Sequence, residues 1–193
     1  MKKIPTLFER VFENHKVKEC LPNVYPGMEW VLNREGKATV KYDGACCAVI
    51  NGEFYKRYDC KKGKIPPDGF IPCCEPDNIT GHWPGWLKVD EKNPVDKWLV
   101  KAYNFSMQCN LSQWTDGTYE AVGEHFNGNP YNRDYDDLIP HGRSVIEVKR
   151  TFDGIRKYLS EHEIEGIVFW KDKQPQCKIK RSDFGFEWPV KKV

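Results

Sequence analysis

The stretch KYDG at residues 41–44 combines two side chains that can take part in chemistry, the amine of Lys41 and the carboxylate of Asp43. A lysine amine is a nucleophile once it has lost its proton, and a neighbouring carboxylate can orient it. The same pair is also common in surface turns, where water solvates both charges. Because a four-residue pattern of this kind arises by chance, its meaning depends on what the rest of the sequence places beside it.

A β-hairpin that carries an arginine is predicted directly after this stretch. The dipeptide Asn51-Gly52 separates the runs ACCAVI and EFYKRY, and it favours a type I′ turn, whose two central residues both need positive φ. A two-residue turn predicts three facing pairs: Ile50 with Glu53, Ala48 with Tyr55, and Cys46 with Arg57. Arg57 is therefore expected beside the start of the first strand, close to Lys41.

Two more lysines are predicted to share one face of a strand near the C-terminal end of the sequence. In CKIKR, Lys178 and Lys180 alternate with Ile179, so both ammonium groups point to one side and the isoleucine points to the other. Two such charges repel each other unless an anion lies near them. A four-residue loop at 171–174 would place Glu165 opposite Lys180.

A second carboxylate lies in the run TYEAVG. Glu120 shares a strand face with Thr118 and Val122, and a carboxylate in such a β-rich run needs a partner or a ligand. Each group also has an ordinary structural explanation: Glu120 and Glu165 would be strand-end carboxylates, and the paired lysines would protect an edge strand from aggregation. The order of these groups along the chain favours a site more than any one of them does alone.

The elements that must position these residues are mostly strands. Besides the hairpin, the patterns predict a strand, a turn and a polar loop at 116–135, a helix at 151–164, and strands at 165–170 and 176–181. Thr151 is the expected N-cap of the helix, with Ile155 and Leu159 on its apolar face. Residues 61–86 are rich in proline and glycine and predict a long irregular loop. Together these features predict an α+β fold with antiparallel sheets, in a single domain over residues 1–193.

Bulk composition argues against some classes of protein. The 193 residues include 30 basic and 28 acidic side chains, for a formal net charge of +2, so a nucleic-acid-binding surface would have to be a local patch. Glu9, Arg10 and Glu13 interrupt any apolar segment near the N-terminus, which argues against a secretory signal. No run approaches the roughly 18 apolar residues that a membrane span needs.

The eight cysteines do not have the spacing of a zinc or disulfide framework. Adjacent pairs stand at 46–47 and 73–74, the other four are scattered, and no C-x-x-C occurs. A cysteine inside an apolar strand behaves as a small hydrophobic residue. The pattern therefore favours the cytoplasm or another reducing intracellular compartment.

Taken in order, KYDG, Arg57, TYEAVG, EGIVF and KIKR resemble the motifs of the covalent nucleotidyltransferase superfamily. This superfamily comprises ATP-dependent DNA and RNA ligases and mRNA-capping guanylyltransferases, and the matches correspond to its motifs I, III, IV and V over residues 41–181. YEAVGEHFNGNPY and LIPHG look like stretches of a small family of 5′-to-3′ RNA ligases that includes a vertebrate member. The resemblance implies a nucleotidyltransferase (adenylation) domain of antiparallel sheets with flanking helices.

The resemblance also implies a mechanism with a lysyl-AMP intermediate. Lys41 would attack the α-phosphorus of ATP and release pyrophosphate, the AMP would pass to an RNA 5′-phosphate, and an RNA 3′-hydroxyl would displace the AMP and seal the strand. The other implied roles are as follows: Arg57 and Glu120 contact the ribose or phosphate, Lys178 and Lys180 bind the α-phosphate, Glu165 holds Mg²⁺ or Mn²⁺, and Asp43 orients Lys41 or the water shell of the metal. Since a lysine attacks only when neutral, nearby cations would help by disfavouring its charged form.

The RNA, with its 5′-phosphate and 3′-hydroxyl ends, would be held by this domain itself. Basic runs at 61–64, 156–157 and 191–192 offer contacts to phosphates, although such runs are also ordinary solvated surface. Phe126 and Tyr131 are candidates to stack on the adenine, and both also suit a hydrophobic core. The protein is expected to act as a monomer.

The sequence departs from the superfamily pattern at two places. Many members have an arginine soon after K-x-D-G, whereas ACCAV stands there in this chain, and Arg57 across the hairpin is assigned that role. Only residues 182–193 follow Arg181, so the OB-fold domain of DNA ligases and capping enzymes is not expected. The alternatives are a GTP-dependent RNA-capping guanylyltransferase, a non-catalytic relative that binds nucleotide or RNA, and an unrelated α+β domain with chance motifs.

Overall fold

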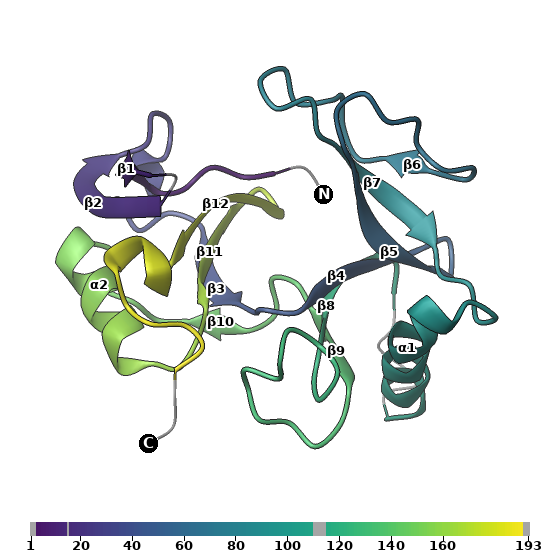
Figure 1. Cartoon of the computed structure of the whole chain (residues 1–193). Coiled ribbons are helices and arrows are strands. Elements are labelled where there is room, and N and C mark those ends of the chain that lie inside the picture. The colour runs from purple at the N-terminus through teal and green to yellow at the C-terminus, as the bar shows by residue number, and fades with distance from the viewer. Residues whose placement is uncertain (1–2, 15, 110–114, 191–193) are drawn as a thin grey trace. The chain divides into compact units, whose positions relative to one another are not determined.

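The computed structural model describes residues 3–14, 16–109 and 115–190, and the chain forms two compact units (Figure 1). The first unit contains residues 1–3 and 43–141, and the second contains residues 4–42 and 142–193. Each unit combines antiparallel sheet with helix, which confirms the α+β class predicted from the sequence. Within the described ranges, no helix is long and apolar enough to cross a membrane.

The first unit holds a six-stranded antiparallel sheet in the order β6-β7-β5-β4-β8-β9. Its strands are β4 (Ala45–Ile50), β5 (Glu53–Cys60), β6 (Ile71–Pro72), β7 (Trp83–Lys88), β8 (Gly117–Val122) and β9 (Asp137–Pro140). The 3₁₀ turn η2 (Pro94–Asp96) leads into the helix α1 (Lys97–Cys109). Alternation along β4 and β8 buries Cys47, Tyr119 and Ala121 in a core that also contains Ala102 of α1.

The β4–β5 hairpin has the turn that the sequence predicts. Asn51 and Gly52 have φ values of 52° and 77°, as a type I′ turn requires. Two of the predicted pairs form, Ile50 with Glu53 and Ala48 with Tyr55. The third, Cys46 with Arg57, would lie just beyond the last paired residues of this hairpin and stays a prediction.

The long loop predicted at 61–86 is interrupted by two strands, so that prediction is wrong for residues 71–72 and 83–86. β7 pairs with β5 along its whole length and with β6 at its centre. The glycine in the WPGW stretch is compatible with a strand because the neighbouring chain approaches closely: a Cβ on Gly85 would lie 2.3 Å from the ring of Phe70. Gly85 therefore marks close packing, whereas Gly63 and Gly69 lie in open turns with positive φ.

The helix α1 was not predicted from the sequence, although Trp98, Leu99, Ala102 and Tyr103 recur at helical spacing and pack in the core of the first unit. A start signal was also present. Asn93 accepts a hydrogen bond from the backbone N–H of Val95 at 3.0 Å, and Pro94 occupies the first position of the turn that precedes the helix.

The second unit contains a hairpin, a four-stranded antiparallel sheet in the order β10-β3-β11-β12, and a helix. The hairpin pairs β1 (Phe8–Glu13) with β2 (Lys16–Val24), and the sheet consists of β3 (Lys37–Lys41), β10 (Val145–Ile146), β11 (Gly166–Lys171) and β12 (Gln174–Lys180). The helix is α2 (Phe152–Glu161), and two 3₁₀ turns are η1 (Glu29–Val31) and η3 (Arg181–Phe184). Ile167 and Ile179 of the sheet are fully buried with Ile155 and Leu159 of α2.

The predicted helix at 151–164 forms and ends three residues earlier than expected. The hydroxyl of Thr151 accepts a hydrogen bond from the backbone N–H of Gly154 at 3.1 Å, which confirms the predicted N-cap. Ile155 and Leu159 lie one turn apart and have no exposed surface. The helix ends at Glu161, because His162 has extended backbone angles.

The β11–β12 hairpin differs from the predicted four-residue loop at 171–174. Asp172 and Lys173 form a two-residue turn, with φ values of 53° and 61°, between the paired residues Lys171 and Gln174. A bulge follows, because Trp170 pairs with Pro175 but Phe169 pairs with Cys177, which leaves Gln176 as an extra residue. The register beyond the bulge is shifted by one residue from the predicted one.

We expect the Thr151→Ala variant to lose about 1 kcal/mol of unfolding free energy, because the backbone N–H of Gly154 loses its acceptor. The matched control is Thr151→Ser, which keeps a hydroxyl at the same position and should remain within a few tenths of a kcal/mol of the wild type. Urea unfolding monitored by circular dichroism measures both. Equal stability of the alanine and serine variants would show that the cap contributes nothing.

Candidate active site

Lys41 and Lys180 lie on either side of one glycine in the sheet of the second unit. Gly166, the first residue of β11, pairs with Lys41 at the end of β3 and with Lys180 at the end of β12. Residues that pair across antiparallel strands point to the same face, so the two lysine side chains share that face with no side chain between them. A Cβ on Gly166 would lie 2.2 Å from the carbonyl oxygen of Ile179, so only glycine fits here.

The carboxylate of Glu165 lies between these two lysines. One of its oxygens accepts a hydrogen bond from the Nζ of Lys41, and the other forms an ion pair with the Nζ of Lys180 at 2.5 Å. The side chain of Glu165 is 6 % exposed, while those of Lys41 and Lys180 are 22 % and 35 % exposed. A carboxylate so far removed from water requires partners of this kind.

The predicted register of Glu165 is wrong by one residue, although Glu165 and Lys180 do form an ion pair. The backbone N–H of Arg181, not of Lys180, donates to the carbonyl of Glu165 at 2.9 Å. The bulge at Gln176 causes this shift. The side chain of Lys180 still reaches the Glu165 carboxylate, because Glu165 precedes the first paired residue of β11 and the strict alternation of faces does not apply to it.

Lys178 lies on the same face as Lys180 and has no ion pair within the described part of the chain. It pairs with Val168 of β11, and the intervening Ile179 is fully buried on the opposite face, as predicted. Burial lowers the pKa of Lys178 below its ordinary value, and the ammonium groups of Lys41 and Lys180 lower it further. Three lysines and one glutamate give this cluster a net positive charge, which favours an anion.

The outer side of β12 is covered at Lys178. Its backbone N–H donates to the carbonyl of Pro5 at 3.0 Å, and its carbonyl accepts from the N–H of Leu7 at 2.7 Å. Lys178 is therefore not on an open strand edge, and protection of an edge strand does not explain it.

The other predicted site residues lie in the first unit. There, four hydrogen bonds hold Asp43 and Gly44, which follow Lys41 in the KYDG stretch. The backbone N–H of Asp43 donates to the hydroxyl of Tyr131 at 2.6 Å. Asn127 donates to the carboxylate of Asp43 at 2.7 Å and to the carbonyl of Gly44 at 3.0 Å. The N–H of Gly44 donates to Glu120 at 3.1 Å. Asn127 and Tyr131 were not predicted in this positioning role.

The carboxylate of Glu120 has a partner in His141, as expected for a carboxylate inside a strand. The Nε2 of His141 lies 2.9 Å from one carboxylate oxygen of Glu120, and the Nδ1 of His141 lies 2.9 Å from the hydroxyl of Thr118. These contacts confirm that Thr118 and Glu120 share a face. His141 directly follows β9, and it was not predicted as a partner of Glu120 because only the pairing of β8 with β9 brings the two residues together.

Arg57 is the remaining predicted site residue of the first unit. The Nε of Arg57 donates to Asp59 at 2.9 Å, and its guanidinium lies 5.7 Å from the centre of the Trp86 ring. Burial and the carboxylate of Glu120 raise the pKa of the Cys46 thiol to about 12, and Arg57 opposes this rise. Arg57 and Glu120 thus both act electrostatically on Cys46.

The other residues singled out from the sequence have structural roles or lie outside the described ranges. Phe126 is 6 % exposed and packs in the core of the first unit, so it is not available to stack on a base. Of the basic runs, 61–64 is exposed, and Lys157 forms an ion pair with Glu161 on α2. The run at 191–192 lies outside the described residues. All eight cysteines are free thiols.

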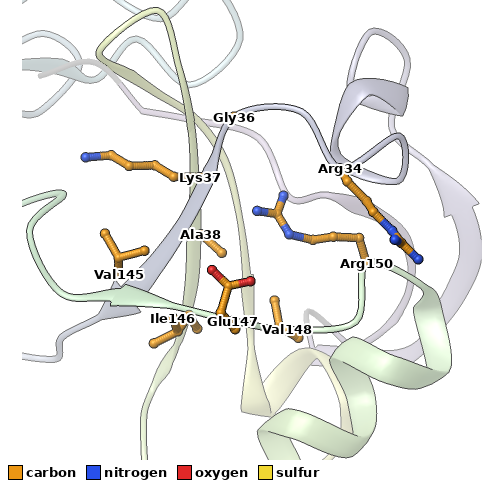
Figure 2. A pocket seen from close by; sticks show the side chains of 9 residues that line it. All are labelled: Arg34, Gly36, Lys37, Ala38, Val145, Ile146, Glu147, Val148 and Arg150. Carbon is orange, nitrogen blue, oxygen red and sulfur yellow. The ribbon is translucent and has the colours of Figure 1, made fainter.

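A separate pocket of about 240 Å³ lies in the second unit beside β3 and β10 (Figure 2). It is lined by Arg34, Gly36, Lys37, Ala38, Val145, Ile146, Glu147, Val148 and Arg150. Its cations do not converge: Lys37 and Arg34 point in opposite directions (Figure 2), and Lys37 donates to the carbonyl of Gly142 at 2.6 Å. The guanidinium of Arg150 stacks 5.2 Å from the Phe169 ring. None of the predicted site residues lines this pocket.

Comparison with known proteins points to the RNA ligases as a class. Curated proteins named RNA ligase 1 match this chain, although no protein-family model matches it. The chain is 27 % identical to the protein of Pongo abelii, over 66 % of this chain and 50 % of that protein, and 29 % identical to that of Danio rerio, over 57 % and 43 %. It is 27 % identical to RNA ligase 1 of Rattus norvegicus, over 79 % and 68 %. The matches span about half the length of the first two relatives.

We expect the Gly44→Ala variant to be destabilised by about 1–3 kcal/mol, because the new Cβ would lie 2.1 Å from the carbonyl oxygen of Ala121 and the strands must separate to admit it. The matched control is Gly117→Ala, at the start of β8, where the nearest atom to a Cβ is 3.8 Å away. Urea denaturation of the two variants gives the comparison. If both alanines cost the same, close backbone approach is not why glycine stands at position 44.

Proposed function

We propose that this protein is an ATP-dependent RNA ligase in which Lys41 carries AMP during the reaction. The observation that carries the proposal is the cluster around Glu165, in which Lys41, Lys178 and Lys180 share one face of a sheet and surround a nearly buried carboxylate. The similarity to proteins named RNA ligase 1 supports RNA as the substrate.

In the proposed first step, the Nζ of Lys41 forms a bond to the α-phosphorus of ATP while the bond from that phosphorus to the pyrophosphate oxygen breaks. Pyrophosphate leaves with the electron pair of that bond, and the proton of the amine passes to solvent, to which Lys41 is partly exposed. Lys41 must be neutral to attack, so its ion pair with Glu165 must break before the bond to phosphorus forms.

Lys178 and Lys180 are proposed to bind the phosphates. The net positive charge of the cluster attracts an anion, and in particular the ammonium of Lys178 has no ion pair within the described residues. A phosphate oxygen beside it would replace the water lost on burial and stabilise the negative charge that develops during transfer.

The residues at Glu165 fit a divalent metal once Lys41 is neutral. Both carboxylate oxygens are bound to ammonium groups in this structure, but a neutral amine no longer forms an ion pair, which frees one oxygen. A carboxylate oxygen together with phosphate oxygens is the ligand set that Mg²⁺ and Mn²⁺ prefer. When bound there, the metal supplies charge neutralisation on the phosphates.

The proposal also includes roles for Glu120, Arg57 and Asp43 of the first unit, which are those that the resemblance implies. Glu120 offers carboxylate oxygens that accept hydrogen bonds from ribose hydroxyls, and Arg57 offers a planar guanidinium suited to phosphate. Asp43 is held by Asn127 and would orient Lys41 or the water shell of the metal. After the first step, AMP passes to an RNA 5′-phosphate, and the attack of a 3′-hydroxyl on this adenylated end joins the strands and releases AMP.

Covalent labelling of Lys41 tests the proposal directly. The protein is stripped of bound nucleotide, incubated with Mg²⁺ and with ATP or GTP labelled at the α-phosphate, and run on a denaturing gel. We expect label from ATP on the wild type and none on Lys41→Ala. The matched control is Lys37→Ala, which removes a lysine from the same strand outside the cluster and should leave labelling unchanged.

Each other outcome of this labelling has a definite meaning. Label from GTP alone would assign the protein to the capping guanylyltransferases. Label that persists in Lys41→Ala would move the nucleophile elsewhere. The complete absence of covalent label, with Mn²⁺ as well as Mg²⁺, would falsify the ligase mechanism and favour a non-catalytic nucleotide-binding relative.

We expect the Lys178→Met variant to be labelled about 10- to 100-fold more slowly than the wild type, because a charge-assisted contact to phosphate is lost. We also expect it to be more stable than the wild type near neutral pH, because it removes a buried charge. The pKa of Lys178 is lowered in the folded state. Between that lowered pKa and the ordinary pKa of lysine, the unfolded chain binds more protons, so the wild type gains stability as the pH rises.

The stability advantage of Lys178→Met should therefore be largest at neutral pH and should shrink as the pH approaches about 10. Chemical denaturation of both proteins across this pH range measures the difference. A variant that is less stable than the wild type at neutral pH would show that Lys178 contributes packing rather than an uncompensated charge.

A further inference from the structure

A thiol, a carboxylate and an imidazole converge in the first unit. Cys46 on β4 and Glu120 on β8 are directly paired across the two strands, and His141 follows β9, which pairs with the other side of β8. The ligand atoms of these three residues all lie within 4.8 Å of one another. Three adjoining strands of one sheet therefore hold the three donor groups.

The donor types select a class of metal. Sulfur and nitrogen ligands suit zinc and related transition metals, whereas Mg²⁺ and Ca²⁺ prefer oxygen ligands alone. Three protein ligands leave a fourth position of a tetrahedral ion open to water or to a substrate group. This set is therefore chemically distinct from the carboxylate of Glu165.

Surrounding contacts already orient two of the three donors. The Nδ1 of His141 lies 2.9 Å from the hydroxyl of Thr118, so its Nε2 faces Glu120. The N–H of Gly44 holds the second oxygen of Glu120. Metal-binding histidines commonly use their other ring nitrogen in such a hydrogen bond, which fixes the ring. Exposures of 17 % for His141 and 12 % for Glu120 show that the donors are sheltered without being sealed from water.

We propose that Cys46, Glu120 and His141 form a binding site for one zinc-class divalent metal ion. The ion replaces the hydrogen bond between His141 and Glu120 and displaces the thiol proton of Cys46 to solvent. Spacing in the sequence does not reveal this set, because its members are brought together only by the strand pairing β4–β8–β9.

Cobalt titration tests the site with a spectroscopic readout. The full chain is treated with a chelator, which is then removed, and Co²⁺ is added while the absorption spectrum is recorded. We expect one equivalent of Co²⁺ to give a thiolate-to-cobalt charge-transfer band and the visible bands of tetrahedral cobalt, and we expect Zn²⁺ to abolish both. The measurement uses neither nucleotide nor RNA, so its outcome is separate from that of the proposed ligase reaction.

Neighbouring cysteines provide matched variants. Cys46→Ala should lose the charge-transfer band, while Cys47→Ala should retain it, because Cys47 is on the opposite face of β4 with its sulfur bonded to the carbonyl of Tyr119. Thr118→Val removes only the hydrogen bond to His141 and should weaken Zn²⁺ affinity about 10- to 100-fold. His141→Gln removes a ligand and should cost at least as much.

Circular dichroism of each variant confirms that it is folded before metal is added. The proposal is overturned if the wild type shows no charge-transfer band, if the band survives in Cys46→Ala, or if His141→Gln binds Zn²⁺ as tightly as the wild type. A band lost in Cys46→Ala but kept in Cys47→Ala, together with weaker Zn²⁺ binding by His141→Gln, establishes the site.

Discussion

The carboxylate of Glu165 is the group on which the arrangement of lysines in the second unit depends. With 6 % of its side chain exposed, it has little access to water, and a buried carboxylate is costly unless cations or donors replace that water. Lys41 and Lys180 meet this requirement from the strands on either side of β11. A slip of either strand by one residue would turn its lysine toward the core and leave Glu165 half paired. Glycine at position 166 completes the arrangement because it lets β12 approach closely.

Much of this arrangement was predictable from local rules. The Asn51-Gly52 dipeptide determined the turn and register of the β4–β5 hairpin, because few residue pairs tolerate positive φ twice in succession. The period of two along a strand placed Lys178 and Lys180 on one face. Thr151 marked the start of α2 through its side-chain hydrogen bond. Each of these predictions needed only residues that lie within a few positions of one another.

What could not be predicted depends on contacts between distant parts of the chain. His141 reaches Glu120 only because β9 returns to β8 after a polar loop, and no local pattern encodes that return. Pro5 covers the edge of β12 from more than a hundred residues away.

The bulge at Gln176 has a consequence for how such hairpins diverge. It lies between the Asp172-Lys173 turn and the two lysines, and it absorbs one residue without reversing the faces of the strand beyond it. A hairpin that lacked Gln176 would form a regular ladder and would still present Lys178 and Lys180 on the same side. The insertion or deletion of a single codon at this point therefore does not change which face of the sheet the following residues of β12 point to. Two homologous genes can differ in length here while their lysines remain structurally equivalent, and a residue-by-residue comparison anchored on the turn would misalign those lysines by one codon.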